Sequence, residues 1–181
     1  VEGKIDVSPS SSIEYAMNPG KYRLLPGFSI TSRTKAMSII LESRFPIESL
    51  DRKTVALTTA SATSVVLVRI ILELFQGLNP VFMVYEQGKE DPYGQADAVL
   101  TIGDLAIKRA SASSLPYVYD LGELWHKETG LPFVFALWQV NYRKTIEKDL
   151  ARLYDILIIS KQYGLSKIEE LARSGAEEFG I

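Results

Sequence analysis

The sequence predicts an α/β fold, and three observations lead to this prediction. Short apolar stretches with the length of strands alternate along the chain with amphipathic stretches of helical spacing. The stretch Thr54–Phe75 holds one complete unit, in which an apolar strand leads through a polar turn into a helix. The stretch Phe133–Val140 is almost entirely apolar, which is typical of a strand buried on both faces. Alternation of this kind favours helices packed on largely parallel sheets.

The composition excludes several classes of protein. The 181 residues are 46% apolar and 23% charged, which is ordinary for a soluble globular protein of one domain or two small lobes. The net charge is −2 and there is no basic stripe, so we expect no nucleic-acid partner. The chain has no cysteine, and His126 is its single histidine, so we expect no metal site. Arg69 and Glu73 interrupt the most apolar helical stretch, so we expect no membrane span.

The N-terminal stretch predicts a strand, a serine-rich turn and a short helix. The strand is expected at Ile5–Val7 and the turn at Ser8–Ser12. Ser11 and Glu14 have the spacing of a capping box, so a short helix should follow the turn. The candidate ligand-binding residues of this turn are Ser10, Ser11 and Ser12; the alternative is that they only cap the helix.

The turn that follows the expected strand Thr54–Leu57 is the strongest candidate for a ligand site. It leads into an amphipathic helix at Val65–Phe75, which Gly77 ends. The first N–H groups of a helix lack partners and lie at the positive end of its dipole, so they attract anions. Small side chains let a carboxylate or phosphate approach, and hydroxyls add donors. The candidate binding residues are Thr59, Ser61, Ala62, Thr63 and Ser64; the alternative is that one hydroxyl is only an N-cap.

The same patterns predict the remaining elements. Before the central unit we expect extended segments at Tyr22–Leu25, Phe28–Thr31 and Lys35–Ser43, and a helical turn at Pro46–Leu50. After it we expect strands at Val81–Tyr85, Asp97–Ile102 and Tyr117–Tyr119, a polar loop at Gln87–Gln95, and helices at Leu105–Arg109 and Leu121–Thr129. The tail should form one helix from Lys144 to Tyr163, stopped by Gly164, and another from about Ser166 to Phe179.

Four blocks of the sequence carry a resemblance to a known family. They are DVSPSSSIEYA at Asp6–Ala16, KTVALTTASATSVVL at Lys53–Leu67, DAVLTIGD at Asp97–Asp104 and YDLGELWHKETGLPFVFALW at Tyr119–Trp138. In this order they resemble the chorismate dehydratases of menaquinone biosynthesis. The blocks span nearly the whole chain, and the last one is long and specific.

The resemblance implies the fold and the activity of that family. The fold would be that of type II periplasmic binding proteins, with two α/β lobes joined by a hinge of crossing strands. The substrate would be a small-molecule dicarboxylate, chorismate, which loses water to give 3-[(1-carboxyvinyl)oxy]benzoate in the futalosine pathway. The resemblance implies a cytoplasmic enzyme with no cofactor and no metal, and the sequence predicts no oligomeric state.

The family also begins with a further strand and loop, ahead of the first of the four blocks. This chain begins at Val1 with no such segment, so the resemblance implies either that the chain is a fragment or that its sequence omits segments. The missing loop would carry an asparagine of the active site. We therefore expect the 181-residue chain alone to be inactive or nearly so.

The resemblance leads to a prediction of the architecture. We expect lobe A at residues 1–36 and 135–181 and lobe B at residues 37–134, because two long apolar strands bracket one α/β unit. The strands near Lys35–Ser43 and Phe133–Val140 should run together through the hinge.

A second prediction concerns the ligand cleft. The turns Ser8–Ser12 and Thr59–Ser64 should face each other across it, because two facing helix N-termini suit a ligand with two anionic groups. Gly103 and Asp104 should lie on the rim of the cleft.

The general base of the reaction has three candidates. Asp104 and Glu14 are the candidates by position, and the alternatives are an N-cap role for Asp104 and a capping-box role for Glu14. The enolpyruvyl carboxylate of the substrate is a third candidate. His126 is expected at the surface, and Phe133 and Trp138 are expected in the core, where one of them could instead stack on the substrate.

Two other functions share most of these features. A solute-binding protein or sensor for a small carboxylate would have the same lobes and the same turns. The sibling enzyme of the pathway, 1,4-dihydroxy-6-naphthoate synthase, shares the fold, although the serines in SPSSSIEY favour the dehydratase.

Overall fold

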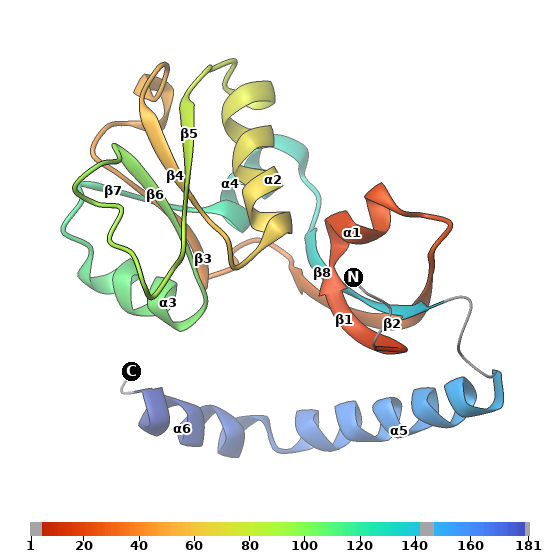
Figure 1. Ribbon diagram of the computed structural model, residues 1–181. Coiled ribbons are helices and arrows are strands. Elements are labelled where there is room, and N and C mark those ends of the chain that lie inside the picture. The colour runs from red at the N-terminus through yellow and green to blue at the C-terminus, as the bar shows by residue number, and fades with distance from the viewer. Residues whose placement is uncertain (1–4, 142–146, 180–181) are drawn as a thin grey trace.

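A computed structural model describes residues 5–141 and 147–179 of the chain. Three parts are visible in Figure 1: a three-stranded sheet, a five-stranded sheet with helices packed on it, and a long helical tail. The polar turns identified in the sequence lie where the first two parts meet, so the arrangement of the sheets decides which residues share a site.

The three-stranded sheet is antiparallel, with strand order β1-β8-β2. Its strands are β1 (Val7–Ser11), β2 (Tyr22–Ser32) and β8 (Phe133–Asn141). The two extended pieces predicted around Pro26-Gly27 are one strand, and the pairing with β8 shifts register between Leu24 and Ser29. A proline lacks the N–H that a regular ladder needs, so the irregularity falls at this point.

The predicted serine-rich turn at Ser8–Ser12 is wrong in its backbone conformation. Val7–Ser11 is a strand along its whole length, because it pairs with β8 from Val7 opposite Val140 to Ser11 opposite Ala136. The short helix α1 (Ser12–Met17) follows directly.

The five-stranded sheet is mixed, with strand order β5-β4-β6-β3-β7. Its strands are β3 (Ile39–Ser43), β4 (Thr54–Thr58), β5 (Val81–Tyr85), β6 (Ala98–Ile102) and β7 (Tyr117–Asp120). β4 is parallel to β5 and β6, whereas β3 is antiparallel to β6 and β7. The prediction of largely parallel sheets is therefore wrong for β3, β7 and the whole smaller sheet, while the α/β class is confirmed.

Helices cover both faces of the larger sheet (Figure 1). They are η1 (Ile47–Ser49), α2 (Ala62–Arg69), its π-helical continuation η2 (Ile70–Phe75), α3 (Gly103–Ala112) and α4 (Leu121–Thr129). Leu67, Ile71 and Leu121 come from α2, η2 and α4 and pack with Val55 and Leu57 in the main apolar cluster. Alternate residues of β4 point to opposite faces, so Ala56 joins a second, smaller cluster with Tyr85 and Val99.

The chain crosses between the two sheets twice, after β2 and before β8. The prediction that the strand near Lys35–Ser43 runs along Phe133–Val140 is wrong: β3 begins only at Ile39 and belongs to the larger sheet. At the end of the sheet that leads into the crossing, β8 pairs with β2, and this pairing reaches Ser32 opposite Phe133. The division into lobes at residues 36/37 and 134/135 stays a prediction.

Gly122 of α4 packs directly on the first crossing segment. A Cβ atom at this position would lie 2.6 Å from Ser32 Oγ, 2.7 Å from the Thr34 carbonyl oxygen and 2.9 Å from the Ala36 amide nitrogen. Two of these atoms belong to the backbone, so the crossing segment itself would have to move.

We expect Gly122→Ala to lower the free energy of unfolding by about 1–3 kcal/mol, the usual cost of overpacking. Chemical denaturation measures this change. The matched control is Gly94→Ala, because nothing lies within 4 Å of a Cβ atom there. Equal stability of the two variants would show that the crossing segment is not held against α4.

The tail consists of α5 (Glu147–Ser166) and α6 (Ile168–Phe179). The predicted stop at Gly164 is wrong, since α5 continues to Ser166; its predicted start at Lys144 lies outside the described residues. Tyr154 of α5 meets Phe28 of β2 edge-on, with 5.6 Å between ring centroids. Among the described residues, no helix is long and apolar enough to cross a membrane.

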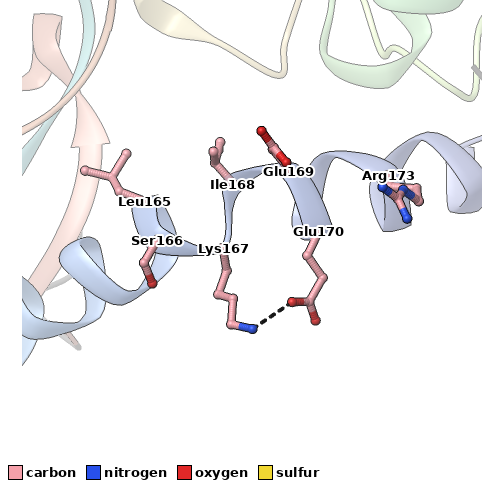
Figure 2. A pocket seen from close by; sticks show the side chains of 7 residues that line it. All are labelled: Leu165, Ser166, Lys167, Ile168, Glu169, Glu170 and Arg173. Atoms are coloured by element: carbon pink, nitrogen blue, oxygen red, sulfur yellow. Dashed lines mark hydrogen bonds and ion pairs between the residues drawn. The ribbon is translucent and has the colours of Figure 1, made fainter.

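A hollow of about 540 Å³ lies where α5 meets α6 (Figure 2). Its lining comes from the tail alone, and Figure 2 shows the ion pair between Lys167 Nζ and Glu170 Oε2, which are 3.0 Å apart. The hollow therefore lies away from the polar turns that the sequence singles out.

Candidate active site at the junction of the two sheets

The carboxyl ends of the parallel strands β5, β4 and β6 share one edge of the larger sheet. In open α/β sheets, ligands bind outside this edge. Two of the predicted binding turns, Thr59–Ser64 after β4 and Gly103-Asp104 after β6, lie there because each follows its strand directly. The larger sheet thus brings together two parts of the candidate site that are far apart in sequence.

The hydroxyl groups of the turn after β4 form hydrogen bonds within the turn itself. Ser61 is the N-cap of α2: its Oγ accepts a hydrogen bond from the Ser64 N–H at 3.2 Å and lies 2.8 Å from Ser64 Oγ. The Thr58 hydroxyl accepts from the Ala60 N–H at 3.1 Å. The capping alternative is therefore confirmed for Ser61, and Ser64 is fully buried. A ligand has to use other donors of this turn.

Those donors are backbone groups at the start of α2. Within residues 5–141 and 147–179, no group accepts a hydrogen bond from the N–H of Ala62 or Thr63. Ala62 is exposed, and both N–H groups lie at the positive end of the helix dipole. The turn thus keeps two donors without an acceptor; Ala62 is exposed to an approaching anion, whereas Thr63 is buried.

The start of α2 is in contact with the start of α1. Thr63 Oγ1 accepts a hydrogen bond from the Ile13 N–H at 3.3 Å and lies 3.4 Å from Ser12 Oγ. The structure therefore brings the two predicted regions together, and Ser12 is the predicted serine whose side chain lies at this contact. Ser10 and Ser11 are strand residues whose carbonyl oxygens accept from Gln139 Nε2, at 3.3 and 3.0 Å.

The second turn of the sheet edge begins at Gly103, whose φ of +68° favours glycine. Its N–H donates to the Ser38 carbonyl at 2.7 Å, which ties the turn to the start of β3. Asp104 is exposed in the first turn of α3, and the N-cap of α3 is Ile102. The N-cap alternative for Asp104 is therefore wrong, and its carboxylate faces solvent at this edge.

Glu14 has structural partners instead of a capping box. Its Oε1 accepts from the Tyr22 hydroxyl at 2.7 Å and from Asn18 Nδ2 at 3.4 Å. The N-cap of α1 is Ser11, which makes no side-chain cap hydrogen bond. The predicted capping box is therefore wrong, and Glu14 holds α1 against β2.

One side chain that joins the two turns of the sheet edge was not predicted. Gln87, in the loop after β5, donates from Nε2 to the Ile102 carbonyl at 2.8 Å, and its Oε1 accepts from the Ile102 N–H at 3.0 Å. Gln87 was expected only as part of a polar loop. Its role depends on a contact with a strand fifteen residues away, which no local pattern reveals.

A buried carboxylate on β3 was also missed. Glu42 is fully buried and accepts from Arg109 Nε at 2.7 Å, from Ser113 Oγ at 2.6 Å and from the Tyr93 hydroxyl. The Arg109 guanidinium also stacks over the Tyr93 ring, 3.9 Å from its centroid. Burial and the hydrogen bond to Glu42 raise the pKa of Tyr93 well above its usual value. This network fastens α3 and the loop that precedes β6 to the centre of the sheet.

The remaining candidates have packing roles or lie apart from these turns. The Phe133 ring packs edge-to-face against Trp125 and Phe135, which agrees with its predicted position in the core. Trp138 meets Phe28 at 6.3 Å between ring centroids. His126 is only half-exposed, with its Nδ1 buried, so the predicted surface position is not fully met. Across the described segments, no three His, Cys, Asp or Glu side chains are placed to hold a metal ion.

Comparison with solved structures identifies the fold. A protein from Archaeoglobus fulgidus superposes with a TM-score of 0.63 at 19% identity, over 97% of this chain and 62% of that chain. An ABC transporter protein from Parabacteroides distasonis gives 0.56 at 20% identity, over 97% and 61%. An ancestral arginine-binding protein gives 0.50 at 17% identity, over 93% and 71%. The fold is thus that of the two-lobed periplasmic binding proteins, and the chain spans about 62% of the first of these structures.

Comparison of sequences identifies the family. The chain is 34% identical to a protein of Thermus thermophilus named chorismate dehydratase, over all of this chain and 70% of that protein. The sequence model that describes menaquinone (vitamin K2) biosynthesis proteins matches residues 1–181. The chain therefore belongs to the menaquinone-biosynthesis family.

Proposed function

We propose that the protein is a chorismate dehydratase, a hydro-lyase that converts chorismate to 3-[(1-carboxyvinyl)oxy]benzoate and water. Membership of the menaquinone-biosynthesis family and the name of the Thermus thermophilus relative support this proposal. The structural observation that carries it is the contact between Ser12 and Thr63, because it places the available N–H groups of α2 at the junction of the two sheets.

The substrate has the charges that such a site suits. Chorismate carries one carboxylate on its ring and another on its enolpyruvyl group. We propose that the N–H groups of Ala62 and Thr63 bind one of them, since backbone donors at a helix start hold a carboxylate without a basic side chain. The edge at Gly103 and Asp104 would face the rest of the substrate. This mode of binding also fits a chain whose net charge is −2.

The reaction needs a proton acceptor and a leaving water. The C3 proton is acidified by conjugation with the ring carboxylate; when it is removed, the C4–O bond breaks and the oxygen leaves as water after gaining a proton. The ring becomes aromatic, which supplies the driving force. No electron is gained or lost in this step, so it needs no redox cofactor. We propose that it also proceeds without a metal, and that the protein acts in the cytoplasm.

Asp104 is the better of the two candidate side chains for the base. It is exposed at the sheet edge, and no other group of the described chain forms a hydrogen bond or ion pair with its carboxylate. The carboxylate of Glu14 is already bound by Tyr22 and Asn18. The enolpyruvyl carboxylate of chorismate remains the alternative base.

The direct test is to mix the protein with chorismate and to follow the product by ultraviolet absorbance and mass spectrometry. The assay uses the protein as the organism makes it, with the Thermus thermophilus enzyme as the positive control. We expect an aromatic product lacking one water, formed without added metal or nucleotide and in the presence of a chelator. Binding without conversion would favour a solute-binding protein. The absence of both binding and conversion would contradict the proposal.

A further inference from the structure

We infer that Gln87 is a positioning residue that sets the distance between the two turns of the candidate site; this inference rests on the proposed function. The first turn begins at Thr59 and leads to the free N–H groups of α2. The second is the Gly103-Asp104 turn at the start of α3. The two turns follow neighbouring strands, but the backbone ladder between those strands ends before it reaches them.

The ladder between β4 and β6 is short. These strands pair only at Val55 opposite Ala98 and at Ala56 opposite Val99. β6 continues to Ile102, three residues beyond the last pair, while β4 ends at Thr58, where it pairs with Tyr85 of β5 on its other side. The end of β6 therefore needs a different partner on the side that faces β4.

Gln87 supplies that partner. Its side-chain amide binds both the N–H and the carbonyl of Ile102, at 3.0 and 2.8 Å, which is the pair of hydrogen bonds that an adjacent strand would make. Since the amide donates one bond and accepts the other, it fixes the Ile102 peptide groups in direction as well as in position. The following residue, Gly103, is held from the other side by the Ser38 carbonyl at 2.7 Å.

The segment that carries Gln87 is also tied to the first turn. The Thr59 N–H donates to the carbonyl of Tyr85, the last residue of β5, at 3.1 Å. Two residues further along the chain, Gln87 reaches across the end of β4 to Ile102. The segment Tyr85–Gln87 thus contacts the first turn directly and the second through Ile102, the residue before Gly103, so a change at Gln87 shifts the second turn relative to the first. For a substrate with two carboxylates, that distance affects binding more than it affects the chemical step.

The test compares Gln87→Ala, which removes both hydrogen bonds, with Gln87→Glu, which keeps the length and the acceptor but loses the donor. We expect Gln87→Ala to raise KM for chorismate about tenfold with kcat changed less than twofold, and Gln87→Glu to raise KM by less. Hydrogen exchange of the Ile102 amide should become faster in Gln87→Ala. The control is Gln95→Ala, an exposed glutamine of the same loop, which should leave KM and the exchange of Ile102 unchanged.

The outcomes separate the inference from the proposed function. A wild-type KM in Gln87→Ala, or a fall in kcat that equals the rise in KM, would overturn the positioning role while the dehydratase proposal stands. If Gln87→Ala folds poorly, Gln87→Glu carries the test, and a wild-type KM in that variant together with unchanged Ile102 exchange would overturn the inference. A wild-type protein that neither binds nor converts chorismate would overturn the proposed function and this inference with it.

Discussion

Glu42→Gln is expected to lower the free energy of unfolding by about 3 kcal/mol, the low end of the cost of breaking a buried ion pair. Glu42 is fully buried, and its carboxylate accepts hydrogen bonds from Arg109, Ser113 and Tyr93. The amide of glutamine brings two donors to a place where three donors already converge, so Arg109 loses its counter-ion and at least one donor loses its acceptor. The Arg109 side chain is 28% exposed, so water partly solvates its charge in the variant and limits the loss of stability.

The matched control is Glu73→Gln, which breaks the surface pair between Arg69 and Glu73 at 3.1 Å. An exposed pair of this kind contributes about 0–1 kcal/mol, so this variant should be nearly as stable as the wild type. Chemical denaturation of both variants gives the comparison. A loss in Glu42→Gln no larger than in Glu73→Gln would contradict the role of Glu42 in fastening α3 and the loop before β6.

A double replacement distinguishes an ion pair from simple packing at Glu42. Replacing Glu42 with leucine and Arg109 with methionine removes both charges, and such exchanges are often neutral or stabilising. We therefore expect the double variant to be more stable than Glu42→Gln.

Local patterns predicted the elements that depend on their own residues. The strand at Thr54 and the helix after it follow from an apolar run, a hydroxyl at the N-cap and helical spacing, and the structure has all three. The helix at Leu121 was predicted with both ends correct, since Asp120 caps its start and Gly130, in the left-handed conformation, ends it.

The missed features depend on partners that are distant in sequence. Ser8–Ser11 has the composition of a turn, yet β8 makes it a strand, because the ladder supplies hydrogen bonds that serine would otherwise seek locally. In the sequence, Glu42 is one polar residue in an apolar strand. Its burial depends on the hydrogen bond from Arg109, which lies sixty-seven positions later in the chain. The candidate site also depends on distant partners. Its small residues predicted a turn that binds an anion, but the hydrogen bonds between Ile13 and Thr63 and between Gln87 and Ile102 are seen only in the fold.

Ala62→Pro tests whether a substrate carboxylate binds the backbone donors at the start of α2. Ala62 is the first residue of α2, where proline is tolerated because its missing N–H has no partner within the helix. Ser61 has φ −148° and ψ 106°, the extended conformation that a residue before proline prefers. The variant should therefore keep its fold and lose one donor.

The measurement is the dissociation constant of chorismate by calorimetry, with Ala62→Gly as the control that retains the N–H. Loss of one hydrogen bond to a charged group costs about 1.5–3 kcal/mol, so we expect Ala62→Pro to bind chorismate roughly ten- to a hundred-fold more weakly than the wild type. Ala62→Gly should bind within about threefold of the wild type, because glycine at this position changes only the helix propensity. Wild-type affinity in a correctly folded Ala62→Pro variant would show that the carboxylate does not bind at the start of α2.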